Sequence, residues 1–401
     1  MKKSHIDWCP VIPDHWEEKR IKDIAFLQSG NSITAMDIAE EGKYPVYGGN
    51  GLRGYTNNYT NDGDYVLIGR QGALCGNINY AYGKFYATEH AVVVYTKNEE
   101  ITYWLGETLK AANLYRLSMT AAQPGLAVST LNIQFIPYPP RKERIRIANY
   151  LAEKCTEIDH QESLLTSKRD AYLRLKKSII NHAVTRGLNP NVKMKDSGIE
   201  WIGEVPEHWE VKRLKNVVEC NAKSLGENTP KDSIIKYVEI SDVDHVHGIN
   251  NIQSLMFGEA PSRARRITQK GDIIISTVRT YLKAIAKIED DDIIVSTGFA
   301  VLHPTKCNGE YLAYYILSES FINRVEMLLK GTSYPAINAS DLVSINVLIP
   351  PLPEQHAIAT YLGDKCAKID TIVSNLDKQI SRYADLKRSL IDEVITGKRA
   401  V

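Results

Sequence analysis

Several common signatures of chemistry are missing from this 401-residue sequence. Its six cysteines form no C-x-x-C pair, so neither a disulfide framework nor a zinc site is predicted. No apolar run approaches the ~18 residues of a membrane helix, and the first residues lack the apolar core of a signal peptide. These absences predict a cytoplasmic protein that does not bind membranes.

The net charge is also small, at +1, but the charges are unevenly distributed. Residues 141–186 contain eleven Lys and Arg against six Asp and Glu, and residues 263–283 contain six against one. Local basic stretches of this kind permit nucleic-acid binding without a basic pI for the whole chain.

Motifs for catalysis are weak or absent. No G-x-x-x-x-G-K-[ST] phosphate loop occurs, and the letters G-x-G-x-x-G at residues 49–54 are followed by turn residues instead of a helix. His90 and His303 are single histidines beside predicted strands and are interpreted as structural. Because nothing assembles a nucleophile, a base and oxyanion donors, we predict no catalytic residue, no metal ligand and no enzyme activity of this chain alone.

What the sequence does contain is an internal repeat. The phrase Pro13–Arg20, with its His-Trp pair, returns 193 positions later at Pro206–Arg213, while Pro139-Pro140 returns 211 positions later at Pro350-Pro351. The flanks are therefore copies, and the bodies between them differ in length by 18 residues, which we expect chiefly before Gly271. This pattern suggests one task performed on two different targets.

Each repeat ends in a stretch with the spacing of a long helix. Prolines precede both stretches, and Gly187 and Gly397 mark their ends. At about 1.5 Å per residue, each helix would measure roughly 65 Å. Apolar residues at a strict spacing of seven predict that the two helices supercoil. These residues are Leu151, Ile158, Leu165, Tyr172 and Ile179 in the first copy, and Leu362, Ile369, Leu376, Tyr383 and Leu390 in the second.

The bodies before the helices contain short β-branched runs bounded by Gly and Asp turns, which predict strands. Thr88–Ala91 and Thr297–Ala300 correspond at a register of 209, so the two bodies are expected to share a fold with different loops. The predicted fold class is α+β with an internal repeat. The predicted segments are the first body at 1–140, a long helix at 141–187, a polar linker at 188–198, the second body at 199–350 and a second long helix at 351–401.

Polar, basic and aromatic residues interleaved with glycine lie in the divergent bodies. Arg, Asn and Gln form the paired hydrogen bonds that identify guanine and adenine, while Lys, Ser and Thr suit phosphates. The predicted DNA-contacting residues of the first body are Arg53, Tyr55, Asn57, Arg70, Gln71 and Lys84. Those of the second body are Arg263, Arg265, Arg266, Arg279, Thr280, Tyr281, Lys283, Ser333 and Tyr334.

Three groups of motifs point to a family. Pro-x-His-Trp-x-x-Lys-Arg occurs twice, Ile-Pro-Pro-Leu-Pro-Glu-Gln-His-Ala-Ile-Ala occupies residues 349–359, and the helices end in Leu-Lys-Lys-Ser-Ile-Ile and Leu-Lys-Arg-Ser-Leu-Ile. Over essentially its whole length, the chain resembles the specificity subunit of Type I restriction-modification systems. The resemblance implies two target recognition domains, each for one half of a split double-stranded DNA site, and two long helices packed as an antiparallel coiled coil that fix the unread spacer. It also implies that the repeat is an internal pseudo-twofold one.

The resemblance also implies partners. Two methyltransferase (modification) subunits would dock on the repeated regions and supply S-adenosylmethionine and adenine-N6 methylation. Restriction or motor subunits would use ATP and Mg to cleave DNA, and this chain would bind no cofactor. Two alternatives stay open here: a structural adaptor whose bodies bind protein, and a specificity subunit that serves a fused methyltransferase-nuclease. The missing motifs disfavour a stand-alone methyltransferase or nuclease.

Overall fold

The computed structural model describes residues 1–96, 102–118, 124–244, 248–329 and 335–401. The chain divides into two compact units, of which the first contains residues 1–166 and 377–401 and the second contains residues 167–376. Each unit therefore combines one body with about half of each long helix.

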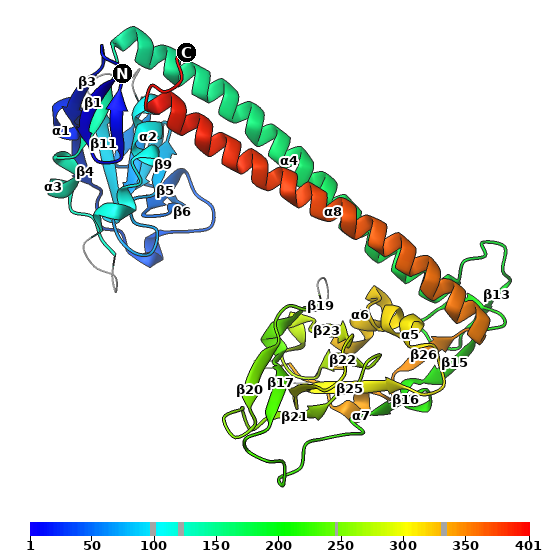
Figure 1. Cartoon of the computed structure of the whole chain (residues 1–401). Coiled ribbons are helices and arrows are strands. Elements are labelled where there is room, and N and C mark those ends of the chain that lie inside the picture. The colour runs from blue at the N-terminus through cyan, green and yellow to red at the C-terminus, as the bar shows by residue number, and fades with distance from the viewer. Residues whose placement is uncertain (97–101, 119–123, 245–247, 330–334) are drawn as a thin grey trace. The chain divides into compact units, whose positions relative to one another are not determined.

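The first unit is built on two four-stranded sheets (Figure 1). Residues alternate across the antiparallel sheet, so that Val66 and Ile68 pack toward helix α2 (Thr102–Ala111) and Leu67 packs toward the mixed sheet. Burial on both faces explains why these strands are continuous apolar runs. The antiparallel sheet contains, in order, β4 (Ala25–Ser29), β11 (Ala91–Thr96), β8 (Tyr65–Gly69) and β9 (Ile78–Ala81). The mixed sheet contains β6 (Gly51–Thr56), β5 (Tyr44–Gly48), β10 (Lys84–Ala87) and β7 (Asn61–Asp62), with β5 and β10 parallel.

Shorter elements complete the first unit. β1 (Lys2–Ile6) pairs with β2 (Cys9–Ile12), and β3 (Glu17–Arg20) pairs with β12 (Phe135–Tyr138) just before the first long helix. The other short elements are α1 (Ile21–Ile24), η1 (Ala35–Asp37), η3 (Leu114–Leu117) and α3 (Val128–Asn132).

The body of the second unit repeats this architecture. Ile273 and Ile275 pack toward α5 (Gly309–Ile316) and α6 (Glu319–Met327), and Ile274 packs between the sheets. The antiparallel sheet contains β16 (Val218–Cys220), β25 (Phe299–Pro304), β22 (Ile273–Ser276) and β23 (Ile285–Lys287). The mixed sheet contains β20 (Gln253–Met256), β17 (Ile234–Val238), β24 (Ile293–Ser296) and β21 (Ala264–Ile267), with β17 and β24 parallel. The strand orders of the two bodies therefore correspond position by position.

The length difference between the bodies lies mainly at one hairpin. Two residues separate β5 from β6, whereas fourteen separate β17 from β20, and those fourteen include η5 (Ile240–Asp242), β18 (Val243–Asp244) and β19 (Gly248–Ile249). This position, before Gly271, is where the sequence repeat predicted the extra residues.

The predicted linker at 188–198 is partly a strand. Its residues in β13 (Met194–Asp196) pair with β14 (Glu204–Pro206), as β1 pairs with β2 in the first copy. The second repeat thus begins inside the predicted linker. The other short elements of this unit are β15 (Glu210–Arg213), which pairs with β26 (Asn346–Ile349), η4 (Leu214–Asn216), η6 (Thr280–Leu282) and α7 (Ala339–Leu342).

The long helices are α4 (Arg141–Arg186) and α8 (Leu352–Ile395), which run antiparallel as a coiled coil. In the first unit, Lys387 Nζ lies 2.6 Å from Asp159 Oδ1, and in the second, Lys176 Nζ lies 2.6 Å from Asp370 Oδ1. These two ion pairs are repeat equivalents at a register of 211. Of the ten heptad residues, six are buried: Leu151, Ile158, Leu362, Ile369, Leu376 and Leu390. The other four are half-buried: Leu165, Tyr172, Ile179 and Tyr383.

The repeated phrase at residues 13–20 and 206–213 forms a junction at the start of each long helix. In the first unit, the buried Trp16 donates its indole N–H to Glu143 Oε1 at 3.0 Å, and His15 Nε2 lies 2.9 Å from Glu143 Oε2. Glu143 lies in the first turn of α4, where a carboxylate is favoured by the helix dipole. After α8, Gly397 has φ 72°, and a Cβ there would lie 2.4 Å from Pro13 Cγ. The phrase therefore joins the beginning of α4 to the end of α8.

The second unit has the same junction. Trp209 donates its indole N–H to Glu354 Oε2 at 3.1 Å, and His208 Nε2 lies 2.7 Å from the same oxygen. Gly187, which follows α4, has φ 77°, and a Cβ there would lie 3.3 Å from the Trp209 ring. The roles of the two long helices are therefore exchanged between the units.

Candidate nucleic-acid interface

The structure divides the predicted DNA-contacting residues of the first body into groups. Arg53 on β6 and Gln71 after β8 are both exposed and line one depression, together with Asn50 and His90. Glycines form much of its wall, and the addition of a Cβ at Gly69 would bring it within 2.1 Å of Gly49 O. This close approach of two loops holds the Arg53 and Gln71 side chains at one rim.

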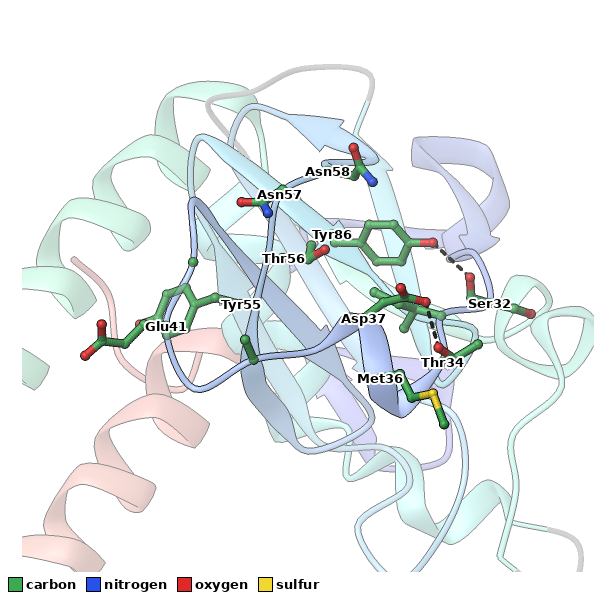
Figure 2. Close-up of a pocket in the computed structure, with 13 residues that line it drawn as sticks. Ser32, Thr34, Met36, Asp37, Glu41, Tyr55, Thr56, Asn57, Asn58 and Tyr86 are labelled. Carbon is green, nitrogen blue, oxygen red and sulfur yellow. Dashed lines mark hydrogen bonds between the residues drawn. The ribbon is translucent and has the colours of Figure 1, made fainter.

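Tyr55 and Asn57 belong to a second depression, shown in Figure 2. Its wall includes Tyr86, whose hydroxyl donates to Ser32 O at 2.9 Å, and a Thr34 hydroxyl that donates to Asp37 Oδ2 at 2.6 Å. Hydroxyl, amide and carboxylate groups thus face a common space that an extended polar ligand could enter.

The other two predicted residues of this body are engaged within it. Arg70 is half-buried and donates from Nη1 to Ser29 Oγ at 3.1 Å. Lys84 Nζ lies 3.9 Å from Asp62 Oδ2 and 4.8 Å from the centre of the Tyr59 ring. Arg70 thus braces the loop that presents Gln71, and Lys84 is partly neutralised by its neighbour.

In the second body, three predicted arginines lie on or next to β21. The exposed Arg263 donates from Nε to Glu239 Oε2 at 2.9 Å, and the Arg265 guanidinium lies 4.7 Å from the centre of the Phe257 ring. The Nε of Arg266 is buried and has no hydrogen-bond partner among the described residues. The structure therefore groups these three cations along one edge strand of the mixed sheet.

The remaining predicted residues of the second body follow β22. Arg279 is exposed, the Thr280 hydroxyl lies 3.5 Å from Pro335 O, and Lys283 Nζ lies 2.9 Å from Glu326 Oε1. Ser333 and Tyr334 lie outside the described residues, as does the Tyr281 side chain. Arg279 and Lys283 are on the β22–β23 loop, whereas the other arginines are on or next to β21.

The described residues contain no cluster of three His, Cys, Asp or Glu that could hold a metal ion. Burial raises the pKa of the Cys9 thiol to about 11 and that of Cys307 to about 11, and it also raises the pKa values of Cys155 and Cys366. Because the thiolate is the reactive form, these four cysteines are poor nucleophiles at neutral pH. Of the helices in the described part of the chain, none is long and apolar enough to cross a bilayer.

Sequence reasoning missed two features of these loops. It did not place Asn50 or His90 beside Arg53, because only the fold brings the loops after β5 and β10 next to the loop after β8. It also did not show that Arg279 corresponds to Gly72, as the strand pairing does. The run of glycines between 69 and 76 was the available signal, since glycine often marks left-handed backbone.

Two copies of one α+β unit, each carrying its own set of polar loops, define a tandem repeat of a binding domain. The sequence profile of the Type I restriction modification DNA specificity domain matches residues 13–164 and 206–382. The chain therefore belongs to this family and carries two such domains.

Individual relatives agree with this assignment. The chain is 42% identical to the Escherichia coli Type I restriction enzyme EcoprrI specificity subunit over 139 residues, which are 34% of this chain and 35% of that protein. It is 24% identical to the Methanocaldococcus jannaschii MjaVIII specificity subunit over 96% of this chain and 93% of that protein. These relatives are specificity subunits, so the chain is the specificity component and not a catalytic subunit of a Type I system.

A solved structure shares the fold. It comes from work on the structural basis underlying complex assembly and conformational transition of the type I R-M system. Its TM-score to this chain is 0.69 at 16% sequence identity, and the match covers 97% of this chain and 100% of that one. The α+β fold with two bodies and two long helices is thus confirmed.

Proposed function

We propose that each body binds one half of a bipartite double-stranded DNA site and that the two halves differ in sequence. The observation that carries this proposal is that the two bodies have identical strand orders but present different side chains on their loops. A single chain with two different binding surfaces can recognise an asymmetric site, which a symmetric homodimer does not.

The proposed contacts divide by chemistry. Arg53 and Gln71 on one rim of the first body, and the arginines of β21 and the β22–β23 loop in the second, carry the donors that suit base edges in the major groove. Lys84 and Lys283 are assigned to phosphates, since a lysine ammonium acts as a point charge. Tyr55, Asn57, Thr280, Tyr281, Ser333 and Tyr334 complete the proposed contact surface.

The long helices are proposed to set the number of unread base pairs between the half-sites. Each is an uninterrupted helix of 44 or 46 residues. Their length would be roughly 65–70 Å at about 1.5 Å per residue. Because the helices are paired by heptad contacts and by an ion pair in each unit, a change of helix length would change the permitted gap.

The proposed partners are two modification subunits, which dock on the repeated helical regions, and restriction or motor subunits. S-adenosylmethionine, ATP and Mg would be bound by those subunits, and we assign no cofactor to this chain. Since its partners act on cellular and incoming DNA, we place the chain in the cytoplasm.

The proposal is tested by the complex of this chain with its modification subunits. Methylation of a DNA library by this complex, followed by mapping of modified adenines, should give two short motifs separated by a fixed number of unspecified bases. A contiguous motif, or methylation without sequence preference, would contradict it, and the second result would favour a structural adaptor.

A matched pair of variants tests the first binding surface. Gln71→Ala should relax the motif in one half-site only, whereas Gln28→Ala, at an exposed position on β4, should leave both halves unchanged. Equal effects of the two substitutions would remove Gln71 from the proposed surface.

A further inference from the structure

The loops that follow β8 and β22 have the same length and register but are built from different residues. The last β8–β9 pair is Ile68 with Ile78, and the last β22–β23 pair is Ile275 with Ile285, so each loop has the same length. Gly69 N donates to Asn77 O at 2.8 Å in the first body, and Ser276 N donates to Ala284 O at 2.9 Å in the second. The two loops therefore correspond residue by residue at a register of 207.

A second set of hydrogen bonds confirms this correspondence. Cys75 N donates to Gly72 O at 3.0 Å, and its equivalent Leu282 N donates to Arg279 O at 2.9 Å. Gly72 in the first body thus occupies the position of Arg279 in the second.

The backbone at these positions favours glycine. Gly72 and Gly76 have φ values of 86° and 84°, and their equivalents Arg279 and Lys283 have φ values of 51° and 48°. The left-handed region is unfavourable for a residue with a Cβ, because the Cβ approaches the backbone carbonyl oxygen. The second body therefore holds an arginine and a lysine where the first body uses the residue that the turn prefers.

The contacts of Lys283 give a reason for its presence. Its ammonium lies 2.9 Å from Glu326 Oε1, so it ties the loop to α6 of its own body. Arg279 has no such role. It is exposed, no described residue forms an ion pair with its guanidinium, and its side chain makes no capping hydrogen bond to η6, which it precedes. The described fold does not need a side chain at 279, since the first body makes the same turn with glycine.

Strained non-glycine residues concentrate at functional sites, where the strain fixes a side chain in position. We propose that Arg279 is the residue with which the second body identifies one guanine of its half-site. This inference rests on the proposed function, in which the second body binds DNA. Guanine presents two acceptors, O6 and N7, to the major groove, and the planar guanidinium matches both at once. A phosphate contact would not require a fixed backbone, because a flexible lysine serves it equally well.

The match of Gly72 with Arg279 also implies that the two bodies recognise different bases. At the equivalent position the first body has Gly72, and no atom lies within 4 Å of a Cβ built there. That body therefore has no side chain to make this contact, and its nearest exposed donor on the loop is the neighbouring Gln71. The loop after β22 thus supplies an arginine contact to one half-site, and the corresponding loop after β8 supplies none to the other.

The test uses the complex of this chain with its modification subunits and a DNA library randomised over both half-sites. Arg279→Gly should abolish the preference for guanine at one position of one half-site, a loss of roughly 5- to 150-fold in discrimination, the equivalent of about 1–3 kcal/mol. Arg279→Lys should retain overall DNA affinity but lose the preference for guanine, since lysine keeps the positive charge but lacks the planar, bidentate guanidinium. Replacement of that guanine by 7-deazaguanine, which lacks the N7 acceptor, should weaken binding by the wild-type complex and not by the Arg279→Gly complex.

A loss of recognition in the Arg279→Gly variant would not be due to misfolding, because glycine is the residue that the backbone conformation at this position favours. The melting temperature of the variant should be equal to or higher than that of the wild type. An unchanged motif for the Arg279→Gly complex, or a uniform loss of its affinity for all sequences, would overturn the inference about Arg279. The proposed function would still stand in that case, provided that the wild-type complex gives a split motif. Failure of the wild-type complex to show any split motif would instead overturn the proposed function.

Discussion

The hydrogen bond from the buried Trp to the Glu of each junction is predicted to stabilise the packing of each body against the long helices. We expect Glu354→Ala to destabilise the second unit, because it removes the acceptor of the Trp209 indole N–H. Trp209 is 1% exposed, so its N–H cannot turn to water. A buried donor left without a partner costs about 1–3 kcal/mol. The lost attraction between the carboxylate and the N-terminus of α8 adds about 0.3–1 kcal/mol.

These contributions together give about 1.3–4 kcal/mol. For a unit of this size, 1 kcal/mol shifts the melting temperature by about 2–4 °C, so the expected decrease is about 3–16 °C. Glu354→Gln should be much milder, at about 1–4 °C, since the amide oxygen still accepts the indole N–H and only the charge is lost. Glu143→Ala should act in the same way on the first unit, through Trp16.

Differential scanning calorimetry of the purified chain measures both transitions. The matched control is Asp364→Ala, which removes an exposed carboxylate from the same helix and should stay within about 0.5 kcal/mol of the wild type. Equal melting temperatures for Glu354→Ala and Asp364→Ala would refute the reasoning. A decrease for Glu354→Gln as large as that for Glu354→Ala would show that the charge matters and the hydrogen bond does not.

Three further predictions concern the helices and the buried thiols. Asp159→Lys should lower stability by about 0.5–1 kcal/mol, as expected for a partly exposed pair, and adding Lys387→Asp should restore most of it; no recovery in the double variant would contradict the pairing. Deletion of the heptad at residues 166–172 together with its repeat equivalent at 377–383 should shorten or abolish the permitted gap between half-sites, as measured by methylome mapping, and an unchanged gap would refute the spacer role. Burial raises the pKa of Cys9 from 9.0 to about 11, so its contribution to stability is complete below pH 9 and is lost as the pH rises through 11. Cys9→Ala should therefore lose stability less steeply between pH 9 and 11 than the wild type, and parallel stability curves would contradict this.

Local patterns in the sequence were sufficient to predict much of the fold. The β-branched run before Gly69 is a strand because both of its faces are buried, and the heptad residues lie in two long helices that end before Gly187 and Gly397. The repeated Pro-x-His-Trp phrase was visible, but its bond to Glu143 was not, since these residues are more than 120 positions apart and only tertiary packing brings them together.

The loops were harder to predict, because different residues can adopt the same backbone conformation. Ile68 pairs with Val92 and Ile275 pairs with Ala300, which places β11 and β25 at a register of 208. The sequence similarity of Thr88–Ala91 to Thr297–Ala300 had suggested 209, one residue away. A shift of one residue exchanges the two faces of a strand. Which residues of the two bodies correspond is therefore determined by the strand pairing and not by sequence similarity. The same limitation concealed the match of Gly72 with Arg279, which share no chemistry.

The composition of the compact units has a consequence for synthesis of the chain. The first unit includes Leu390, Val394 and Ile395 in its core, so residues 1–166 cannot complete their packing until the last segment has been made. The second unit, residues 167–376, is complete earlier. At roughly 5–20 residues per second, the ribosome takes about 10–40 s between residues 166 and 377. During this interval Leu151 and Ile158 lack their partners on α8, so the half that is translated first is the half that finishes folding last.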